Sequence, residues 1–137
     1  MTEPVVLDSF ALVSVFHKEP GWRKVRDTLY ALSSQGEKAQ LCLINWGEFY
    51  YVIKRRVGQG KAEEAIALVG QLPIALVSVD DRLVKEAANL KSEHPISYAD
   101  AFCIATALRL RGQILTNDPE YRAVEHLVKV IWLGSKT

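Results

Sequence analysis

The chain has 137 residues, of which 49% are hydrophobic and 24% are charged, and its formal net charge is +1 at pH 7. This composition is ordinary for a soluble globular protein, and the length suits one domain with a sizeable core. No uninterrupted apolar run approaches the ~18 residues of a membrane span, so we expect no membrane association. The net charge neither favours nor excludes nucleic acid as a partner, because local patches matter more than the sum.

The cellular compartment follows from the N-terminus and the cysteines. The N-terminus lacks a basic region followed by a long apolar core, so we expect no signal peptide. Cys42 and Cys103 each lie inside an apolar run, which predicts buried thiols rather than a disulfide, and two thiols alone make a poor zinc site. We therefore expect a cytoplasmic protein.

Strand-type and helix-type patterns alternate along the chain, without hairpin signals, internal repeats or linkers. This alternation predicts an α/β fold, with a central parallel sheet of about five strands and helices on both faces in three α/β/α layers. Residues 1–137 are expected to form a single domain. In chain order, the predicted elements are a strand at 5–7, helices at 9–18 and 21–36, a strand at 41–44, helices at 45–57 and 61–71, a strand at 74–79, helices at 80–94 and 97–111, a strand at 114–116, a helical turn after Pro119 and a strand at 128–133.

The stretch from Ser97 to Asp118 contains an aspartate in an unusual place. At 100° per residue, Asp100 falls on the same helical stripe as the apolar residues Cys103, Ile104, Ala107 and Leu108. A carboxylate on a buried face needs a partner, and no lysine or arginine stands at a helical spacing that would supply one. This missing partner points to a functional role for Asp100.

Three further acids accompany Asp100 near the ends of predicted strands. Asp8 ends the first strand, Asp118 lies just past the strand at 114–116, and Glu48 lies in the first turn of the helix after the second strand. Ligand sites in parallel α/β sheets form outside the carboxyl ends of the strands. We therefore expect Asp8, Glu48, Asp100 and Asp118 to converge at that edge.

Each acid also has an interpretation as a helix cap. Ser97 and Asp100 have the spacing of a capping box, Asn45 and Glu48 come close to one, and Asp8 and Asp118 each precede a predicted helix. A cap contributes about 1 kcal/mol, whereas two carboxylates ~4 Å apart repel by ~4 kcal/mol at an effective dielectric of ~20. Convergence of all four acids therefore requires a cation, and hard oxygen ligands suit Mg²⁺ or Mn²⁺ rather than zinc.

These four stretches resemble the signature motifs of the PIN domain, in the family's order and spacing. They are Val5–Leu12 around Asp8, Asn45–Val52 around Glu48, Ser97–Ala101 around Asp100, and Leu115–Asp118. The resemblance runs from Val5 to Leu133, and the size is that of the VapC-type toxins of toxin–antitoxin pairs. It implies a Mg²⁺- or Mn²⁺-dependent ribonuclease, commonly a homodimer, that is silenced by a small cognate antitoxin.

The resemblance also implies roles for individual residues in hydrolysis of an RNA phosphodiester. Asp8 and Asp100 would ligate the metal directly, while Glu48 and Asp118 would act through water or help to deprotonate the nucleophile. Ser9 and Thr116 are lesser candidates. Ser9 would donate to an acid or cap its helix, and Thr116 would orient Asp118, contact the phosphate or simply end its strand.

Small departures from the family pattern bear on substrate shape more than on the metal site. Phe10 replaces the small residue often found two positions after the first aspartate, and Phe102 stands where leucine is usual. Asn45-Trp46 is less typical than a serine or threonine before the glutamate. Trp46, Tyr50 and Tyr51 raise the question of base stacking, but such residues more often pack a core or a subunit interface.

Two alternatives stand beside the ribonuclease interpretation. One is a metal-dependent nuclease or phosphatase of this fold that acts on DNA or a small phosphate ester. The other is a non-catalytic PIN-like binding module whose acids serve only as caps. A haloacid-dehalogenase-type phosphatase is disfavoured because no second aspartate lies two residues after Asp8, and a dinucleotide enzyme because no glycine-rich turn follows the first strand.

A partner is also expected from the apolar surface of the helices at 45–57 and 61–71. Tyr50 and Tyr51 are adjacent on one helix and point about 100° apart, so they cannot both face the same core. Val57, Ile66 and Val69 add further apolar surface. Because large exposed apolar patches are rare on monomers, we expect a second copy of the chain or an antitoxin helix to cover this pair of helices.

Overall fold

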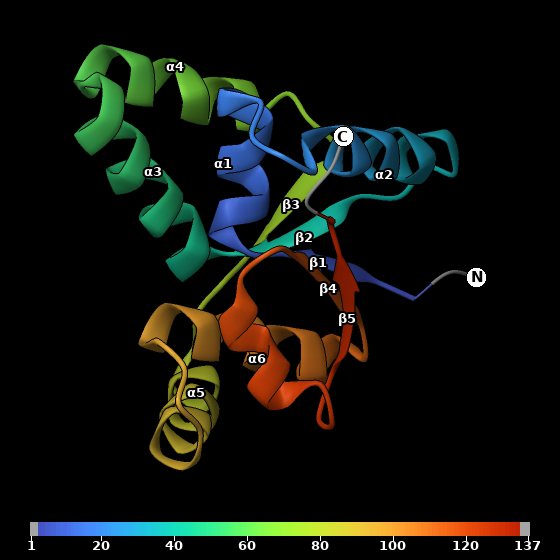
Figure 1. Cartoon of the computed structure of the whole chain (residues 1–137), viewed down its shortest axis with the longest axis vertical. Coiled ribbons are helices and arrows are strands. Elements are labelled where there is room, and N and C mark those ends of the chain that lie inside the picture. Colours follow the sequence, from blue (N-terminus) through green and yellow to red (C-terminus); the bar gives the residue numbers. More distant parts are fainter. Residues whose placement is uncertain (1–2, 135–137) are drawn as a thin grey trace.

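Five short parallel strands form the centre of the computed structural model, which describes residues 3–134 (Figure 1). Helices cover both faces of this sheet, so the predicted three-layer α/β/α fold is confirmed. Residues 1–2 and 135–137 of the predicted domain lie outside the described residues. The elements are β1 (Val5–Leu7), α1 (Ser9–His17), α2 (Trp22–Ser34), β2 (Ala39–Cys42), α3 (Leu43–Val57), α4 (Gln59–Val69), β3 (Ile74–Val77), α5 (Asp81–Glu93), α6 (Tyr98–Leu110), β4 (Gln113–Thr116), the 3₁₀ helix η1 (Pro119–Val124) and β5 (Lys129–Trp132).

The order of the strands places two carboxyl ends side by side at the centre of the sheet. The order is β3-β2-β1-β4-β5, and every neighbouring pair is parallel. The chain therefore winds from β1 outward to β3 and then crosses back to β4 on the other side of β1. Such a reversal opens a crevice between the two central strands at their carboxyl ends. β1 and β4 meet there in register, with Leu7 opposite Leu115.

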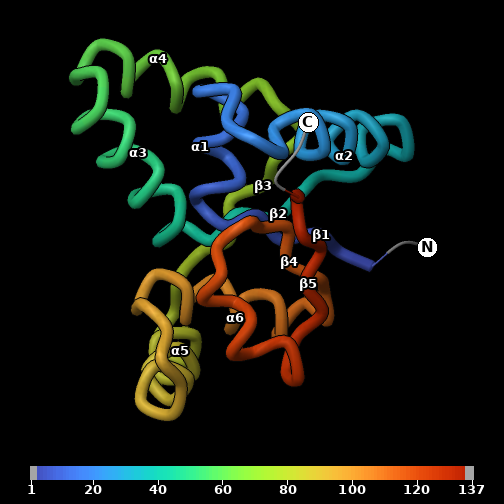
Figure 2. The backbone as a smooth tube through the Cα atoms, in the orientation of Figure 1, coloured from blue at the N-terminus to red at the C-terminus, as the bar shows by residue number. Residues whose placement is uncertain are grey.

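Alternation along the strands divides the core into two parts. On β1, Val5 and Leu7 pack in a cluster with residues of α1 to α4, whereas Val6 faces a second cluster with α5 and α6. Figure 2 shows these two groups of helices on opposite sides of the strands. Because strand side chains alternate with a period of two, sheets covered on both faces are apolar at successive positions, as β1 is.

The boundary between β2 and α3 differs from the prediction. A strand was expected at 41–44 with Asn45 as the cap of the following helix, which is wrong: α3 begins at Leu43, and Cys42 is its N-cap. Asn45 is fully buried, and its Nδ2 donates to the carbonyl of Ala99 at 3.1 Å. Its Oδ1 has no hydrogen-bond partner within residues 3–134. Asn45 therefore links α3 to α6, whereas local capping rules predicted that it would cap the start of its own helix.

The other predicted helices and strands agree with the structure. Each remaining predicted element lies within two residues of its observed bounds, and Pro119 opens η1. Cys42 and Cys103 are buried free thiols. Within residues 3–134 no helix is both long and apolar enough to cross a membrane.

A close approach at Gly112 generates a prediction about stability. A Cβ atom at Gly112 would lie 2.6 Å from the carbonyl oxygen of Pro4 and 3.1 Å from its Cβ. We expect Gly112→Ala to lower the free energy of unfolding by about 1–3 kcal/mol, since the backbone must shift. Gly60→Ala is the matched control: a Cβ atom at Gly60 in α4 would meet nothing within 4 Å, so helix propensity should raise stability by up to about 1 kcal/mol. Urea denaturation measures both, and equal effects of the two variants would contradict the steric explanation.

Candidate metal centre

Three aspartates meet at the crevice between β1 and β4. Asp8 follows β1 directly, Asp118 lies two residues after β4, and Asp100 lies in the first turn of α6. One carboxylate oxygen from each lies within 4.8 Å of those of the other two. Asp8 and Asp100 are buried, and Asp118 is partly exposed. Of the four acids that the sequence predicts to converge, the structure brings these three together.

Asp8 is held by bonds to both of its carboxylate oxygens. As the N-cap of α1 it accepts a hydrogen bond from the backbone N–H of Ala11 at 2.8 Å, and its other oxygen accepts from the Thr116 hydroxyl at 2.7 Å. Burial raises the pKa of Asp8 to about 7, even though both hydrogen bonds lower it, and the charges of Asp118 and Glu48 raise it further. Asp8 is therefore both a helix cap and a member of the cluster.

Thr116 connects two of the aspartates. Its hydroxyl donates to Asp8 and accepts from the backbone N–H of Asp118 at 3.0 Å. The side chain is fully buried. Because the single hydroxyl proton points at Asp8, Thr116 orients the two aspartates and has no proton left to donate to a phosphate.

Asp100 is 4% exposed, as its place on the apolar stripe predicts. Its backbone N–H donates to the Ser97 hydroxyl at 3.1 Å, which is one half of the expected capping box. The other half is supplied differently, because the Ser97 N–H donates to Glu120 at 2.9 Å rather than to Asp100. The Asp100 carboxylate is thus free of capping and points into the cluster. Burial, the hydrogen bond with Glu120 and the charges of Asp118 and Asp8 raise its pKa to about 8.

Glu120 and Tyr121 are site residues that the sequence reasoning missed. The Tyr121 hydroxyl donates to Oδ1 of Asp100 at 3.1 Å, and the side chain is fully buried. Asp118 caps η1 by accepting from the Glu120 N–H at 2.9 Å, which confirms its expected role as a cap before Pro119. The sequence feature that could have revealed them is the helical turn that Pro119 begins, since this turn brings the next two residues back toward α6.

Glu48 lies beside the three aspartates rather than among them. It is partly buried on α3, and the Ser9 hydroxyl donates to its carboxylate. Its charge acts on the cluster, since it contributes to the raised pKa of Asp8. Ser9 therefore has the expected role of donor to an acid, and that acid is Glu48.

The cluster carries excess negative charge without a cationic side chain. Among the ion pairs of residues 3–134, none involves Asp8, Asp100 or Asp118. Buried carboxylates this close repel one another unless they are protonated or neutralised by a cation. The donor set is all oxygen, with neither imidazole nor thiolate in the group. These residues therefore fit a Mg²⁺ or Mn²⁺ ion rather than zinc.

Comparison with protein families decides where this fold belongs. The family model of the PIN domain matches residues 5–127, which include all three aspartates and Glu48. The chain belongs to the PIN-domain family. Comparison with curated protein sequences gives no significant match.

Solved structures with this PIN fold include several toxin–antitoxin proteins. VapBC2 from Rickettsia felis, bound to a promoter DNA fragment, has a TM-score of 0.75 at 12% identity over 93% of this chain and 96% of that chain. DNA-bound VapBC from Salmonella typhimurium has a TM-score of 0.72 at 15% identity over 98% of this chain and 100% of that chain. VapC20 from Mycobacterium tuberculosis, described as a Sarcin-Ricin loop cleaving toxin, has a TM-score of 0.71 at 17% identity over 88% of this chain and 94% of that chain. At these identities the likeness establishes the fold alone.

The raised pKa values of Asp8 and Asp100 predict an unusual pH dependence of stability. The ordinary pKa of both carboxyls is 3.8. In the folded protein the pKa of Asp8 is raised to about 7 and the pKa of Asp100 to about 8. Between these limits the folded state binds more protons than the unfolded state, so without divalent metal the free energy of unfolding falls as the pH rises from 5 to 8. Each group contributes a slope of at most about 1.4 kcal/mol per pH unit.

Urea denaturation in the presence of a chelator measures this slope. Asp100→Asn should reduce it, because one of the two proton-binding groups is removed. Stability that is constant or rises from pH 5 to 8 would contradict the electrostatic description of the cluster.

Proposed function

We propose that this PIN-domain protein is a Mg²⁺- or Mn²⁺-dependent endoribonuclease and the toxin of a VapBC-type toxin–antitoxin pair. The observation that carries the proposal is the group of three aspartates with oxygens within 4.8 Å of one another. Caps and structural hydrogen bonds do not account for such a group, because two of its members have pKa values raised by burial and mutual repulsion. The description of VapC20 as a loop-cleaving toxin supports the assignment.

In the proposed reaction, a water oxygen attacks the phosphorus of an RNA phosphodiester beside the three aspartates. A P–O bond to this oxygen forms as the P–O bond to one ribose oxygen breaks, and that ribose oxygen takes up a proton and leaves as a hydroxyl. A divalent cation held by Asp8, Asp100 and Asp118 would lower the pKa of water and neutralise charge that develops on the phosphate. We assign Glu48 the role of accepting a proton from the attacking water, with the Ser9 hydroxyl fixing its orientation.

Neighbouring side chains keep the aspartates in position. Thr116 fixes one oxygen of Asp8, and Tyr121 fixes one oxygen of Asp100. Each of these hydrogen bonds leaves lone pairs on the carboxylate for a cation. Thr116 and Tyr121 therefore act as positioning residues in this mechanism.

Substitution of Asp100 tests the proposed activity most simply. We expect Asp100→Asn to abolish cleavage of RNA in the presence of Mn²⁺ and to leave the fold intact. The asparagine side chain can still accept from Tyr121, and the Asp100 N–H bond to Ser97 is unchanged, so the melting temperature should stay the same or rise as repulsion is relieved.

Asp81→Asn is the matched control, since Asp81 is also an aspartate in the first turn of a helix but is exposed on α5. Cleavage of labelled RNA is measured for both variants and for wild type. Purified Asp100→Asn that cuts RNA at the wild-type rate would contradict the proposal. Wild type that cuts DNA but not RNA would contradict RNA as the substrate.

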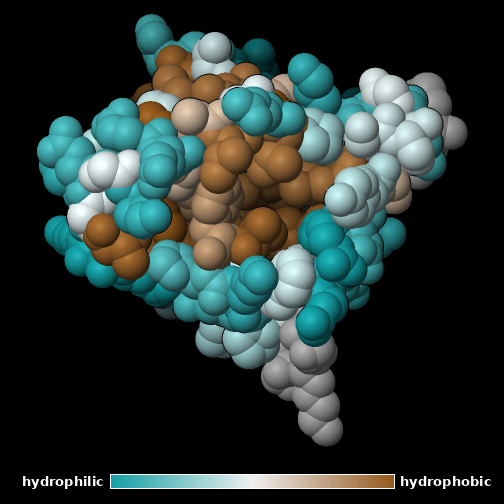
Figure 3. Space-filling model, turned by 90° about the horizontal axis from the view of Figure 1, so that it is seen from above, coloured by the Kyte–Doolittle hydropathy of each residue, from teal (hydrophilic) through white to brown (hydrophobic). Residues whose placement is uncertain are grey.

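The proposed partner is an antitoxin with an amphipathic helix, and the surface that favours it lies over α1, α3 and α4. A groove of about 500 Å³ is lined by apolar residues that include Phe16, Ile53 and Leu68. Figure 3 shows an apolar hollow on the upper face of the molecule. His17 lines the groove, and its Nε2 is buried without a hydrogen-bond partner in the described part of the chain. The similar structures of VapBC complexes support an antitoxin as the occupant.

The surface differs in part from the sequence expectation. Val57 is exposed as expected, but Val69 is buried in the core. The Tyr50 hydroxyl donates to Glu63 at 2.6 Å, and the guanidinium of Arg55 covers the Tyr51 ring at 5.0 Å from its centroid. Both tyrosines therefore have contacts within the chain, and Tyr51 remains 45% exposed.

Light scattering tests whether a second copy of the chain also covers this surface. We expect the isolated chain to have the mass of a dimer at tens of micromolar. Leu68→Glu, which places a charge in a groove-lining residue that is 49% exposed, should then shift the mass toward a monomer. A wild-type monomer at this concentration would contradict the dimer and leave the antitoxin helix as the only cover.

A further inference from the structure

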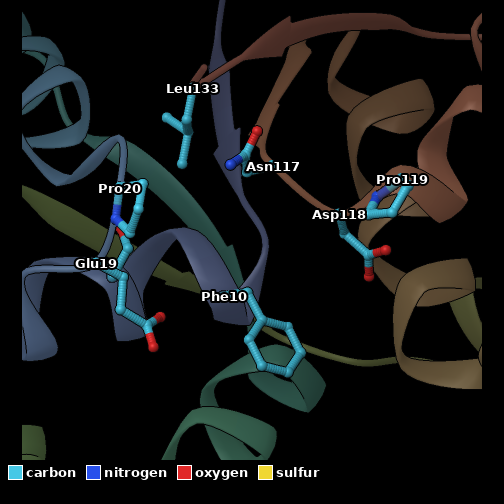
Figure 4. A pocket seen from close by; sticks show the side chains of 8 residues that line it. Phe10, Glu19, Pro20, Asn117, Asp118, Pro119 and Leu133 are labelled. Carbon is cyan, nitrogen blue, oxygen red and sulfur yellow. The ribbon is translucent and has the colours of Figure 1, made fainter. Parts of the chain in front are cut away.

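A cavity of about 400 Å³ opens next to the aspartate cluster, on the side of α1 (Figure 4). Asp118 lines this cavity and also belongs to the group of three aspartates, so the two sites are continuous. The volume lies within the ~300–1,000 Å³ typical of pockets for small ligands. A group attached to a phosphate at the cluster would therefore find a pocket within reach.

The most prominent side chain of the cavity is Phe10. It lies one helical turn from Ser14, so both residues line the cavity from the same face of α1. Figure 4 shows the Phe10 ring between the carboxylates of Glu19 and Asp118, with Asn117 and Leu133 on the opposite side. Phe10 is 38% exposed, although it directly follows two buried residues, Asp8 and Ser9. A large aromatic ring is thus accessible to solvent beside the cluster.

The walls around Phe10 are held in place by contacts within the chain. Asn117 donates from Nδ2 to the carbonyl of Gly134 at 3.2 Å, and the Leu133 N–H donates to the carbonyl of Thr116 at 3.0 Å. On the other wall, Glu19 accepts from Arg56 at 3.1 Å. The cavity is therefore preformed and does not need to be built by a ligand.

The charge of the cavity restricts its occupant. The ionisable groups that line it are the carboxylates of Glu19 and Asp118, and its described lining includes no lysine or arginine. A phosphate would be repelled by this lining, whereas a neutral planar group would stack on the Phe10 ring. The lining therefore disfavours an anionic occupant, and the Phe10 ring offers a stacking surface to a neutral planar one.

We infer that the cavity binds the nucleobase of the nucleotide adjacent to the cleaved phosphodiester, with Phe10 as its stacking platform. The inference rests on the proposed nuclease function. Bases of single-stranded RNA are commonly held by stacking on aromatic side chains. Phe10 is thus a substrate-binding residue for the nucleotide next to the reaction.

Two other aromatic rings are less suited to this role. The Trp22 ring has the cationic groups of Lys18, Arg23 and Arg26 within 4.9–5.6 Å of its centroid. Tyr98 packs edge-on against Phe102, with ring centroids 5.0 Å apart. Neither lines the cavity beside Asp118.

The test combines a change in the protein with a change in the RNA. The cleaved bond of a short single-stranded RNA is first mapped with wild type in Mn²⁺, and an abasic nucleotide is then placed on each side of that bond in turn. When the abasic nucleotide lies on one particular side of the cleaved bond, we expect wild-type kcat/KM to fall about tenfold, a loss typical of one stacked base. Phe10→Ala should lose about tenfold on the intact RNA and nothing further on the abasic RNA, because the same contact has been removed twice.

Two further variants separate stacking from folding. Phe10→Tyr keeps the ring and should cleave both RNAs as wild type does. Tyr30→Ala removes an aromatic ring that is 70% exposed on α2, outside the cavity, and should leave both rates unchanged. Thermal melting of each variant reports whether it is folded. The abasic RNA removes the base contact from the wild-type protein, so this measurement does not depend on any variant folding.

Losses that multiply to about a hundredfold for Phe10→Ala on abasic RNA would overturn the inference, as would wild-type rates for Phe10→Ala on intact RNA. Wild type that cuts no RNA would refute the proposed function instead. The same comparison is then made as equilibrium binding of both RNAs in Ca²⁺. A tenfold weaker affinity of Phe10→Ala for intact RNA alone would support the base pocket, and equal affinities would overturn it.

Discussion

Mutual repulsion among three aspartates, two of them buried, is the constraint on which the proposed metal site of this structure depends. Asp8 and Asp100 are removed from water, and Asp118 adds its charge within 4.8 Å. Carboxylates in such an environment lose solvation and repel each other, so the arrangement costs free energy unless protons or a cation compensate. Within residues 3–134, no lysine or arginine forms an ion pair with any of the three aspartates to offset this cost. Strain of this kind is typical of functional sites, and it supports the proposal that these aspartates do more than cap helices.

The topology of the sheet makes the cluster possible. β1 and β4 are neighbours because the chain crosses back over β1 after forming β2 and β3. Asp8 and Thr116 therefore end adjacent strands, and the hydroxyl between them fixes the carboxylate of Asp8 while it orients the backbone of Asp118. α6 adds Asp100 from the side, where Tyr121 of η1 supports it. Elements far apart in the sequence thus contribute one aspartate each.

The sequence predicted the parts of this site that depend on local pattern. Asp8 and Asp118 follow short apolar runs, and Asp100 interrupts an apolar stripe, so their places at strand ends and on a buried helix face could be predicted. The interaction of Ser97 with Glu120, and of Asn45 with Ala99, could not, because both depend on how α6 packs against η1 and α3. Capping rules treat each helix end alone, and here tertiary contacts replaced the expected partners. The cavity beside Phe10 could not be predicted for the same reason, since its walls come from α1, the α1–α2 loop, the turn after β4 and the residue after β5.

The proposed function depends above all on Asp8, Asp100 and Asp118 holding a divalent cation together. Crystals of wild type grown with Mn²⁺ and measured near the manganese absorption edge test this directly, with crystals of Asp8→Asn as the comparison. We expect an anomalous peak contacted by carboxylate oxygens of all three aspartates in wild type, and a weakened or absent peak in Asp8→Asn. Wild-type crystals at millimolar Mn²⁺ without a peak at the cluster, or with the same peak in both proteins, would contradict it.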